Sequence, residues 1–217
     1  MNATSLTRPG RLAFAALSLT LAWGCTGLRP VAAPHPAFYS LDSSRGAARA
    51  DAPASAPTLI VNPPHAAPGF DSQRIIYVRE AHQLEYFAHS EWVDPPARML
   101  APLIVAAVGS SGAFRAVALT PSAAAGDLRL DTEIIRLQHE FLTRPSRVRF
   151  TLRAYIVDGA TRQVLAWREF DESVAAASED PHGGVVAANR AVEAVLANLA
   201  AFCAEAAREP RGRSVAP

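Results

Sequence analysis

The stretch from Gly69 to Leu103, GFDSQRIIYVREAHQLEYFAHSEWVDPPARMLAPL, decides the fold because it holds two extended segments followed by the start of a helix. Arg74–Arg79 and Leu84–Trp92 are rich in β-branched and aromatic residues and are separated by a break at Glu80–His82, which predicts a β-hairpin. Apolar residues then recur at helical spacing, at Met99, Leu100, Leu103, Ile104, Ala107 and Val108. The stretch therefore predicts a hairpin that leads into an amphipathic helix.

The corner at Asp94-Pro95-Pro96 marks the predicted start of that helix. Asp94 is a favourable N-cap because its carboxylate accepts from free N–H groups, and proline fits the first turn because it lacks a donor there. The corner carries no catalytic signature. We therefore assign structural roles to Trp92, Asp94, Pro95 and Pro96.

Three more strands are predicted on either side of this helix. Thr58–Val61 is short and wholly apolar, as in the interior of a sheet, and Phe114–Leu119 follows a helix-ending turn at Gly109–Gly112. Asp127–Leu142 alternates apolar and polar residues. Its parity changes near Ile134-Ile135, which indicates a β-bulge.

The C-terminal half predicts an antiparallel pair and a second helix. Val148–Ile156 alternates most regularly, Asp158-Gly159 forms a turn, and Val164–Val174 returns beside it. Val185–Phe202 then places apolar residues on one helical face, after a predicted loop at Pro181–Gly184. The predicted fold class is α/β of an α+β-like kind, with a mixed sheet covered by two main helices.

The amino terminus has the pattern of a bacterial lipoprotein signal. Arg8 and Arg11 precede an apolar run that is too short to span a membrane, and Cys25 follows that run directly after Gly24. We expect residues 1–24 to be a signal peptide and Cys25 to carry acyl chains that anchor the protein. The alternative is a plain secretory signal with an incidental cysteine.

Two neighbouring features extend this interpretation. Thr26 is not Asp, and in lipoprotein sorting this resembles the outer-membrane address. With Cys25 acylated, Cys203 has no intramolecular partner, so we expect it to be a small buried residue on the last helix. An intermolecular disulfide is the alternative for Cys203.

Composition divides the mature chain into three parts. Residues 25–57 are rich in Pro, Ala and small polar residues and are predicted to be a tether with a typical reach of roughly 30 Å. Within this tether, Ala37–Leu41 is predicted to add a short strand to the domain edge. Residues 58–205 form the predicted domain, and residues 206–217 a disordered tail.

Charge and motif spacing exclude several classes of function. The formal net charge of +1 becomes −1 when residues 1–24, which hold two Arg and no acidic residue, are removed, so no nucleic-acid partner is predicted. The six histidines lack the spacing of metal ligands, so no metal or cofactor is predicted either. Gly109-Ser110-Ser111-Gly112 follows a helix and precedes a strand, the reverse of a nucleophile elbow.

Two groups of residues are candidates for binding. Arg147, Arg149 and Arg153 share the outward face of one predicted strand, where they either pair with Glu169 and Asp171 or bind an anionic partner. Gly183-Gly184 either cradles a phosphate at a helix start or, as we favour, allows close packing.

These features in sequence resemble the ABC-type transport auxiliary lipoprotein family, the PqiC/YmbA-like proteins. The resemblance covers about residues 38 to 203. Its most specific pieces are Asp71-Ser72 with Arg74, Ile75 and Tyr77, and Trp92 with Pro95, Pro96, Met99 and Leu100. Phe202 departs from the pattern, because this family often has Trp before the position of Cys203.

The resemblance implies a fold similar to the amino-terminal domain of TolB and a non-enzymatic periplasmic subunit on the outer membrane. It also implies partners: an Mce-domain protein and, in some systems, an ABC permease and ATPase that move lipids between the two membranes. Gly69, Asp71 and Arg74 are the candidates for a partner-facing loop. Homo-oligomers are an open possibility.

Two other functions stay open. An envelope lipid hydrolase requires a nucleophile with a general base, and no such constellation is visible in the sequence. A stand-alone periplasmic lipid-binding protein requires a cavity in the domain.

Overall fold

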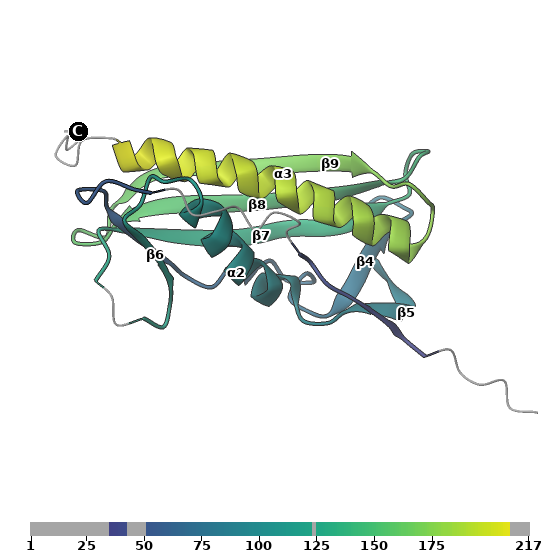
Figure 1. Cartoon of the computed structure of the whole chain (residues 1–217). Helices are drawn as coiled ribbons and strands as arrows, with labels where there is room; N and C mark the ends of the chain where they lie inside the picture. Colours follow the sequence, from purple (N-terminus) through teal and green to yellow (C-terminus); the bar gives the residue numbers. More distant parts are fainter. Residues whose placement is uncertain (1–34, 43–50, 123–124, 209–217) are drawn as a thin grey trace, which may run out of the picture. The chain divides into compact units, whose positions relative to one another are not determined.

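The computed structural model describes residues 35–42, 51–122 and 125–208. These residues form two helices, α2 (Pro96–Gly109) and α3 (Pro181–Arg208), and the strands drawn in Figure 1. The strands are β1 (Ala37–Tyr39), β2 (Thr58–Val61), β3 (His65–Ala66), β4 (Arg74–Val78), β5 (Glu85–Trp92), β6 (Ala116–Leu119), β7 (Leu128–Glu140), β8 (Arg147–Asp158) and β9 (Val164–Ala175).

All of these strands belong to one mixed sheet built around β7. β8 pairs with β7 antiparallel along its whole length, and β9 pairs with the other edge of β8. On its opposite edge, β7 pairs in turn with β2, β3 and β4, all parallel to it. β6 extends β2, while β5 and then β1 extend β4. The sheet does not close into a barrel, and the predicted mixed sheet with two main helices is confirmed.

The predicted hairpins and the β-bulge are present. β4 and β5 form the hairpin of the opening stretch, and β8 and β9 form the C-terminal antiparallel pair. Along β7 the pairing shifts between Ile134, opposite Leu152, and Arg136, opposite Thr151. Ile135 is therefore the extra residue, which is why the apolar parity changes at this point in the sequence.

Both helices pack on one face of the sheet and against each other (Figure 1). α2 buries Leu100, Ile104 and Val108 against β2 and β6. α3 runs along β8 and β9 and is long and apolar enough to cross a membrane by length and composition, but half of its apolar window is buried in the domain. Cys203 is fully buried on α3, and desolvation raises its thiol pKa to about 12, so the prediction of a small buried residue is confirmed.

The predicted N-cap of α2 is wrong. Pro95, not Asp94, is the N-cap residue, and it makes no side-chain capping hydrogen bond. A residue that precedes proline is driven to extended geometry, so both Asp94 and Pro95 stay outside the helix, which begins at Pro96. Asp94 instead forms an ion pair with Arg98, at 3.2 Å.

The predicted start of α3 is also wrong, because Pro181–Gly184 is the first turn of the helix and not a loop. Asp180 accepts a hydrogen bond from the N–H of Gly183 at 2.7 Å, and Pro181 tolerates the first helical position because it needs no acceptor. A Cβ at Gly184 would lie 2.5 Å from Nδ1 of His139. The favoured alternative, close packing of the two glycines, is therefore confirmed.

The predicted edge strand near the amino terminus is present as β1, which pairs parallel with β5. After β1 the chain stays on the domain: Leu41 is buried, and the N–H of Asp42 donates to Oδ1 of Asn189 on α3 at 2.8 Å. The amide of Asn189 donates in return to the carbonyl of Ser40. The domain therefore includes residues before position 58, and only residues 26–36 separate Cys25 from the first strand.

Candidate functional site

The face of the sheet opposite the two helices is the candidate contact surface, and we call it the bare face. In a sheet, the side chains of paired residues on neighbouring strands point to the same face, and successive side chains along one strand point to opposite faces. The ring of His139 faces α3, since it packs against Gly184, so Tyr77, its partner on β4, faces the helices as well. Arg74, Ile76 and Val78 therefore point to the bare face, as do the odd-numbered residues of β8 from Arg147 to Tyr155.

The three predicted arginines lie together on this face, and their side chains have acceptors on β9. Arg149 forms a bidentate ion pair with Asp171, with its closest contact at 2.6 Å, and Arg153 pairs with Glu169 at 2.8 Å. Arg147 donates instead to Ser173, from Nε to Oγ at 2.9 Å. We call these three residues the arginine face. Of the two alternatives for the stripe, pairing with Glu169 and Asp171 is confirmed.

The pKa of Asp171 shows how tightly this ladder is coupled. The hydrogen bonds from Arg149 and from the hydroxyl of Thr151 stabilise the carboxylate and lower its pKa to about 2, although partial burial opposes the shift. The carboxylates thus neutralise two of the arginines and hold their guanidinium groups in fixed orientations. The arginine face presents ordered donors without a large net charge.

The second predicted group, Gly69, Asp71 and Arg74, lies beyond β7 beside the β4–β5 hairpin. Gly69 adopts a φ of +92°, and a Cβ there would lie 3.5 Å from Cδ1 of Leu84. The guanidinium of Arg74, at the start of β4, lies 4.1 Å from the centroid of the Tyr86 ring. Asp71 is exposed between them. The structure thus brings this loop to two exposed residues of the hairpin, while β7 separates it from the arginine face.

Sequence reasoning missed two exposed apolar surfaces, one at each end of β7. The first consists of Phe38, Leu84, Tyr86 and Leu142, and we call it the tether-side surface. Phe38 lies on β1 opposite Glu91, Leu84 and Tyr86 lie at the start of β5, and Leu142 follows β7. The second lies at the start of β9, and we call it the far-end surface; it consists of Tyr155, Val164, Leu165 and Trp167. Trp167 is 63% exposed and stacks on Tyr155 with the ring centroids 6.5 Å apart.

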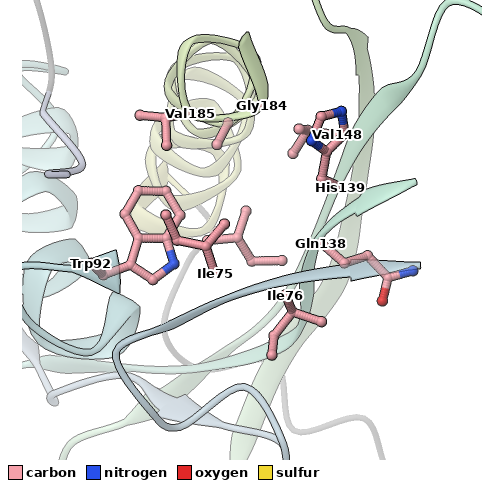
Figure 2. A pocket seen from close by; sticks show the side chains of 10 residues that line it. Ile75, Ile76, Trp92, Gln138, His139, Val148, Gly184 and Val185 are labelled. Atoms are coloured by element: carbon pink, nitrogen blue, oxygen red, sulfur yellow. The ribbon is translucent and has the colours of Figure 1, made fainter. Parts of the chain in front are cut away.

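A small pocket lies between the first turns of α3 and strands β4, β5, β7 and β8 (Figure 2). Trp92 and Ile75 line it from one side, while Gly184 and Val185 of α3 and His139 line it from the other. Its volume of about 10 Å³ is room for a single water molecule. An acyl chain does not fit in this pocket.

His139 is the one strongly buried titratable group at the pocket. Its Nε2 lies 2.8 Å from Oγ of Ser146, while Nδ1 has no hydrogen-bond partner and faces Gly184. Desolvation lowers the pKa of His139, although Glu179 and Asp180 act in the opposite direction. A serine–histidine pair is the arrangement of a nucleophile and its base, but Ser146 is fully buried and His139 only 2% exposed. No substrate reaches this pair, which therefore has a structural role in the fold.

Ser110 and Ser111, the other serine candidates, lack a base. Oγ of Ser110 donates to the carbonyl of Ala107 and Oγ of Ser111 to that of Val108, so both hydroxyls close the last turn of α2. Gly112, with a φ of +67°, completes this helix-ending turn. Within the described residues, no group of three His, Cys, Asp or Glu side chains is arranged to hold a metal ion.

The sequence and the fold both match known proteins. The model of the ABC-type transport auxiliary lipoprotein component family matches residues 39–200. A crystal structure of a Xanthomonas campestris protein assigned to the DUF330 family has 22% sequence identity and a TM-score of 0.66, and the match covers 78% of this chain and 95% of that one. The crystal structure of an uncharacterized protein has 13% identity and a TM-score of 0.62, covering 78% and 99%. At these identities the likeness shows a common fold. No curated protein matches the chain.

Proposed function

The chain belongs to the ABC-type transport auxiliary lipoprotein component family, and we propose that it is a non-catalytic adaptor of an envelope lipid-transport system. The family match over residues 39–200, which runs from the end of β1 into α3, is the observation that carries the proposal. In this system the chain works with an Mce-domain protein, an ABC permease and an ATPase. Together they move lipids between the inner and outer membranes.

Cys25 supplies the membrane attachment in this proposal, and it lies outside the described residues. Acyl chains on Cys25, with Thr26 next to it, would hold the chain at the periplasmic face of the outer membrane. Inhibition of the lipoprotein signal peptidase is expected to leave an uncleaved precursor. A mature form that still accumulates under inhibition would contradict acylation.

The Mce-domain partner is proposed to dock on the bare face of β8 and β9, across the arginine face and the far-end surface. Arg, Tyr and Trp dominate the binding energy of protein interfaces, and Arg153, Tyr155 and Trp167 lie side by side here through the pairing of β8 with β9. Because the carboxylates neutralise Arg149 and Arg153, we expect the contact to depend on shape and hydrogen bonds. Its affinity should then depend only modestly on salt concentration.

The contacts of the candidate nucleophiles support a non-catalytic role. The hydroxyls of Ser110 and Ser111 are engaged in a helix end, and the serine of the His139 pair is fully buried. An independent lipid carrier is the second candidate, but the pocket beneath α3 has no room for a lipid. Bound lipid in mass spectra of the purified acylated chain, beyond its own acyl groups, would favour the carrier.

Co-purification from a detergent extract tests the adaptor proposal. The full acylated chain is expected to recover an Mce-domain protein, while Arg153→Ser and Trp167→Ser should each reduce the recovery. Phe38→Ser is the matched control, because Phe38 is similarly exposed but lies at the other end of the sheet. Recovery of no Mce-domain protein by the unaltered chain would contradict the proposal.

A further inference from the structure

The tether between the acyl anchor and the domain is short. β1 begins at Ala37, so residues 26–36 form the whole connection to Cys25. Eleven residues reach at most roughly 40 Å when fully extended. The start of β1 therefore lies within roughly 40 Å of the membrane that holds the anchor.

The direction of β1 determines which end of the domain is confined. β1 is parallel to β5, with Ala37 opposite Ser90 and Tyr39 opposite Trp92. β1 lies beside the last three residues of β5, and its parallel direction means that the chain approaches β1 from the direction of the β4–β5 turn. Phe38 lies at the entry point, opposite Glu91, and the other three residues of the tether-side surface lie further toward the turn.

The chemistry of this end fits a lipid–water interface. The tether-side surface combines exposed aliphatic and aromatic side chains, and the Tyr86 ring is covered by the guanidinium of Arg74. Aromatic rings with a polar tip and arginines that bury their stems are the side chains that favour the headgroup region. Arg79 is ion-paired to Glu85 at the same end, so these two charges neutralise each other. Apolar burial would then provide most of the attraction.

We propose that the tether-side surface rests on the membrane that carries the anchor, with Phe38 and Tyr86 in its headgroup layer. This inference rests on the proposed acylation of Cys25. The tether holds the surface at a high effective concentration next to the lipid, so contacts that would be too weak for the free domain become populated. Lipid is the occupant because the tether brings every copy of the chain to it.

The same geometry orients the rest of the molecule. The β4–β5 turn lies beyond the Glu140 end of β7, and the β8–β9 turn lies at its Leu128 end. The thirteen residues of β7 place these two ends about 40 Å apart. When the tether-side surface rests on the membrane, the far-end surface is held away from it.

Fluorescent probes on two matched alanines test the proposal. Ala81 lies in the β4–β5 turn and Ala160 in the β8–β9 turn, and both are exposed. Each is changed to Cys in the full chain, acylated at Cys25, where the buried Cys203 is protected from labelling. The labelled proteins are reconstituted in vesicles of phosphatidylethanolamine with a minor share of phosphatidylglycerol, with a nitroxide on the lipid headgroup as quencher.

The expected result is strong quenching of the probe at Ala81 and little quenching at Ala160. Phe38→Ser combined with Tyr86→Ser should weaken the quenching at Ala81, whereas Trp167→Ser should leave it unchanged. Equal quenching at the two positions, or none at Ala81 in a vesicle-bound protein, overturns the membrane contact but not the acyl anchor. A chain that does not float with the vesicles overturns the acyl anchor and the inference together.

Discussion

The two ends of the long strands β7 and β8 both expose apolar side chains, but they are built differently. At the tether-side end, Trp92, His139 and Gly184 pack around a small pocket beneath the first turn of α3. At the far end, Trp167 stacks on Tyr155 above the sheet and is largely exposed. We therefore expect substitutions in the packed residues of the tether-side end to lower the free energy of unfolding. Substitutions at the exposed far end should alter binding without loss of the fold.

The two tryptophans give the largest expected difference between these ends. Trp92 is 3% exposed, so Trp92→Ala should lower the free energy of unfolding by about 3–5 kcal/mol. Trp167→Ala should change it by no more than about 0.5 kcal/mol, as is typical of exposed positions. Denaturant unfolding of both variants measures the difference. Similar losses would mean that the far end is as important to the fold as the tether-side end.

The two-glycine turn gives the next largest effect. In Gly184→Ala the new Cβ would lie 2.5 Å from Nδ1 of His139, so we expect a loss of about 1–3 kcal/mol. Gly109→Ala is the control, because nothing lies within 4 Å of a Cβ at that position. Thermal unfolding of the two variants distinguishes the close contact from a general intolerance of helix-end alanines. Equal midpoints would contradict the packing described for Gly184.

Protonation of His139 should lower the free energy of unfolding as the pH falls below neutral. Desolvation lowers its pKa in the folded state, so the unfolded chain binds more protons as pH falls below about 6.5. The contribution of neutral His139 to the free energy of unfolding is therefore fully present above that pH, and it decreases as the pH falls further. Urea unfolding between pH 7 and pH 5 should show this loss, and His139→Gln should remove it. An unchanged pH dependence in the variant would assign the effect to another group.

The ion pairs of the arginine face should contribute least to stability. Asp171 is partly exposed, so Asp171→Asn is expected to cost at most about 1 kcal/mol, and less at high salt. Its pKa of about 2 lies below the usual value, so its contribution is present above pH 3.8 and is lost as pH falls toward 2. Chemical unfolding at low and high salt measures the cost of the substitution and its salt dependence, and unfolding between pH 4 and pH 2 measures the loss with falling pH. A cost of several kcal/mol that is independent of salt would show that the ladder is part of the core.

Most of the sheet could be predicted because alternation along a strand directly reflects which side chains are buried. The parity change at Ile134-Ile135 even located the bulge. The start of α3 was missed because two glycines weaken a helical pattern, although Asp180 followed by Pro181 is itself a helix-start signal. The prediction of Asp94 as the N-cap was wrong because Pro96 holds Pro95 outside the helix, so that α2 begins one residue later than predicted.

The candidate site was less predictable than the fold. The arginine stripe and its acidic partners follow from strand alternation alone, and the structure confirms their pairing. The exposure of Trp167 does not follow from alternation, because it depends on which face of the sheet α3 covers. The nearness of Gly69 and Arg74 to Leu84 and Tyr86 depends on how the loop before β4 folds back on the hairpin.

Site-specific photo-crosslinking in living cells can show whether one end of the sheet contacts the membrane and the other end contacts a protein partner. A photoreactive phenylalanine analogue replaces Trp167 in one strain and Tyr86 in another. We predict that position 167 crosslinks to an Mce-domain protein and that position 86 does not. Crosslinks to that protein from position 86 alone would contradict docking of the partner at the Trp167 end of the sheet.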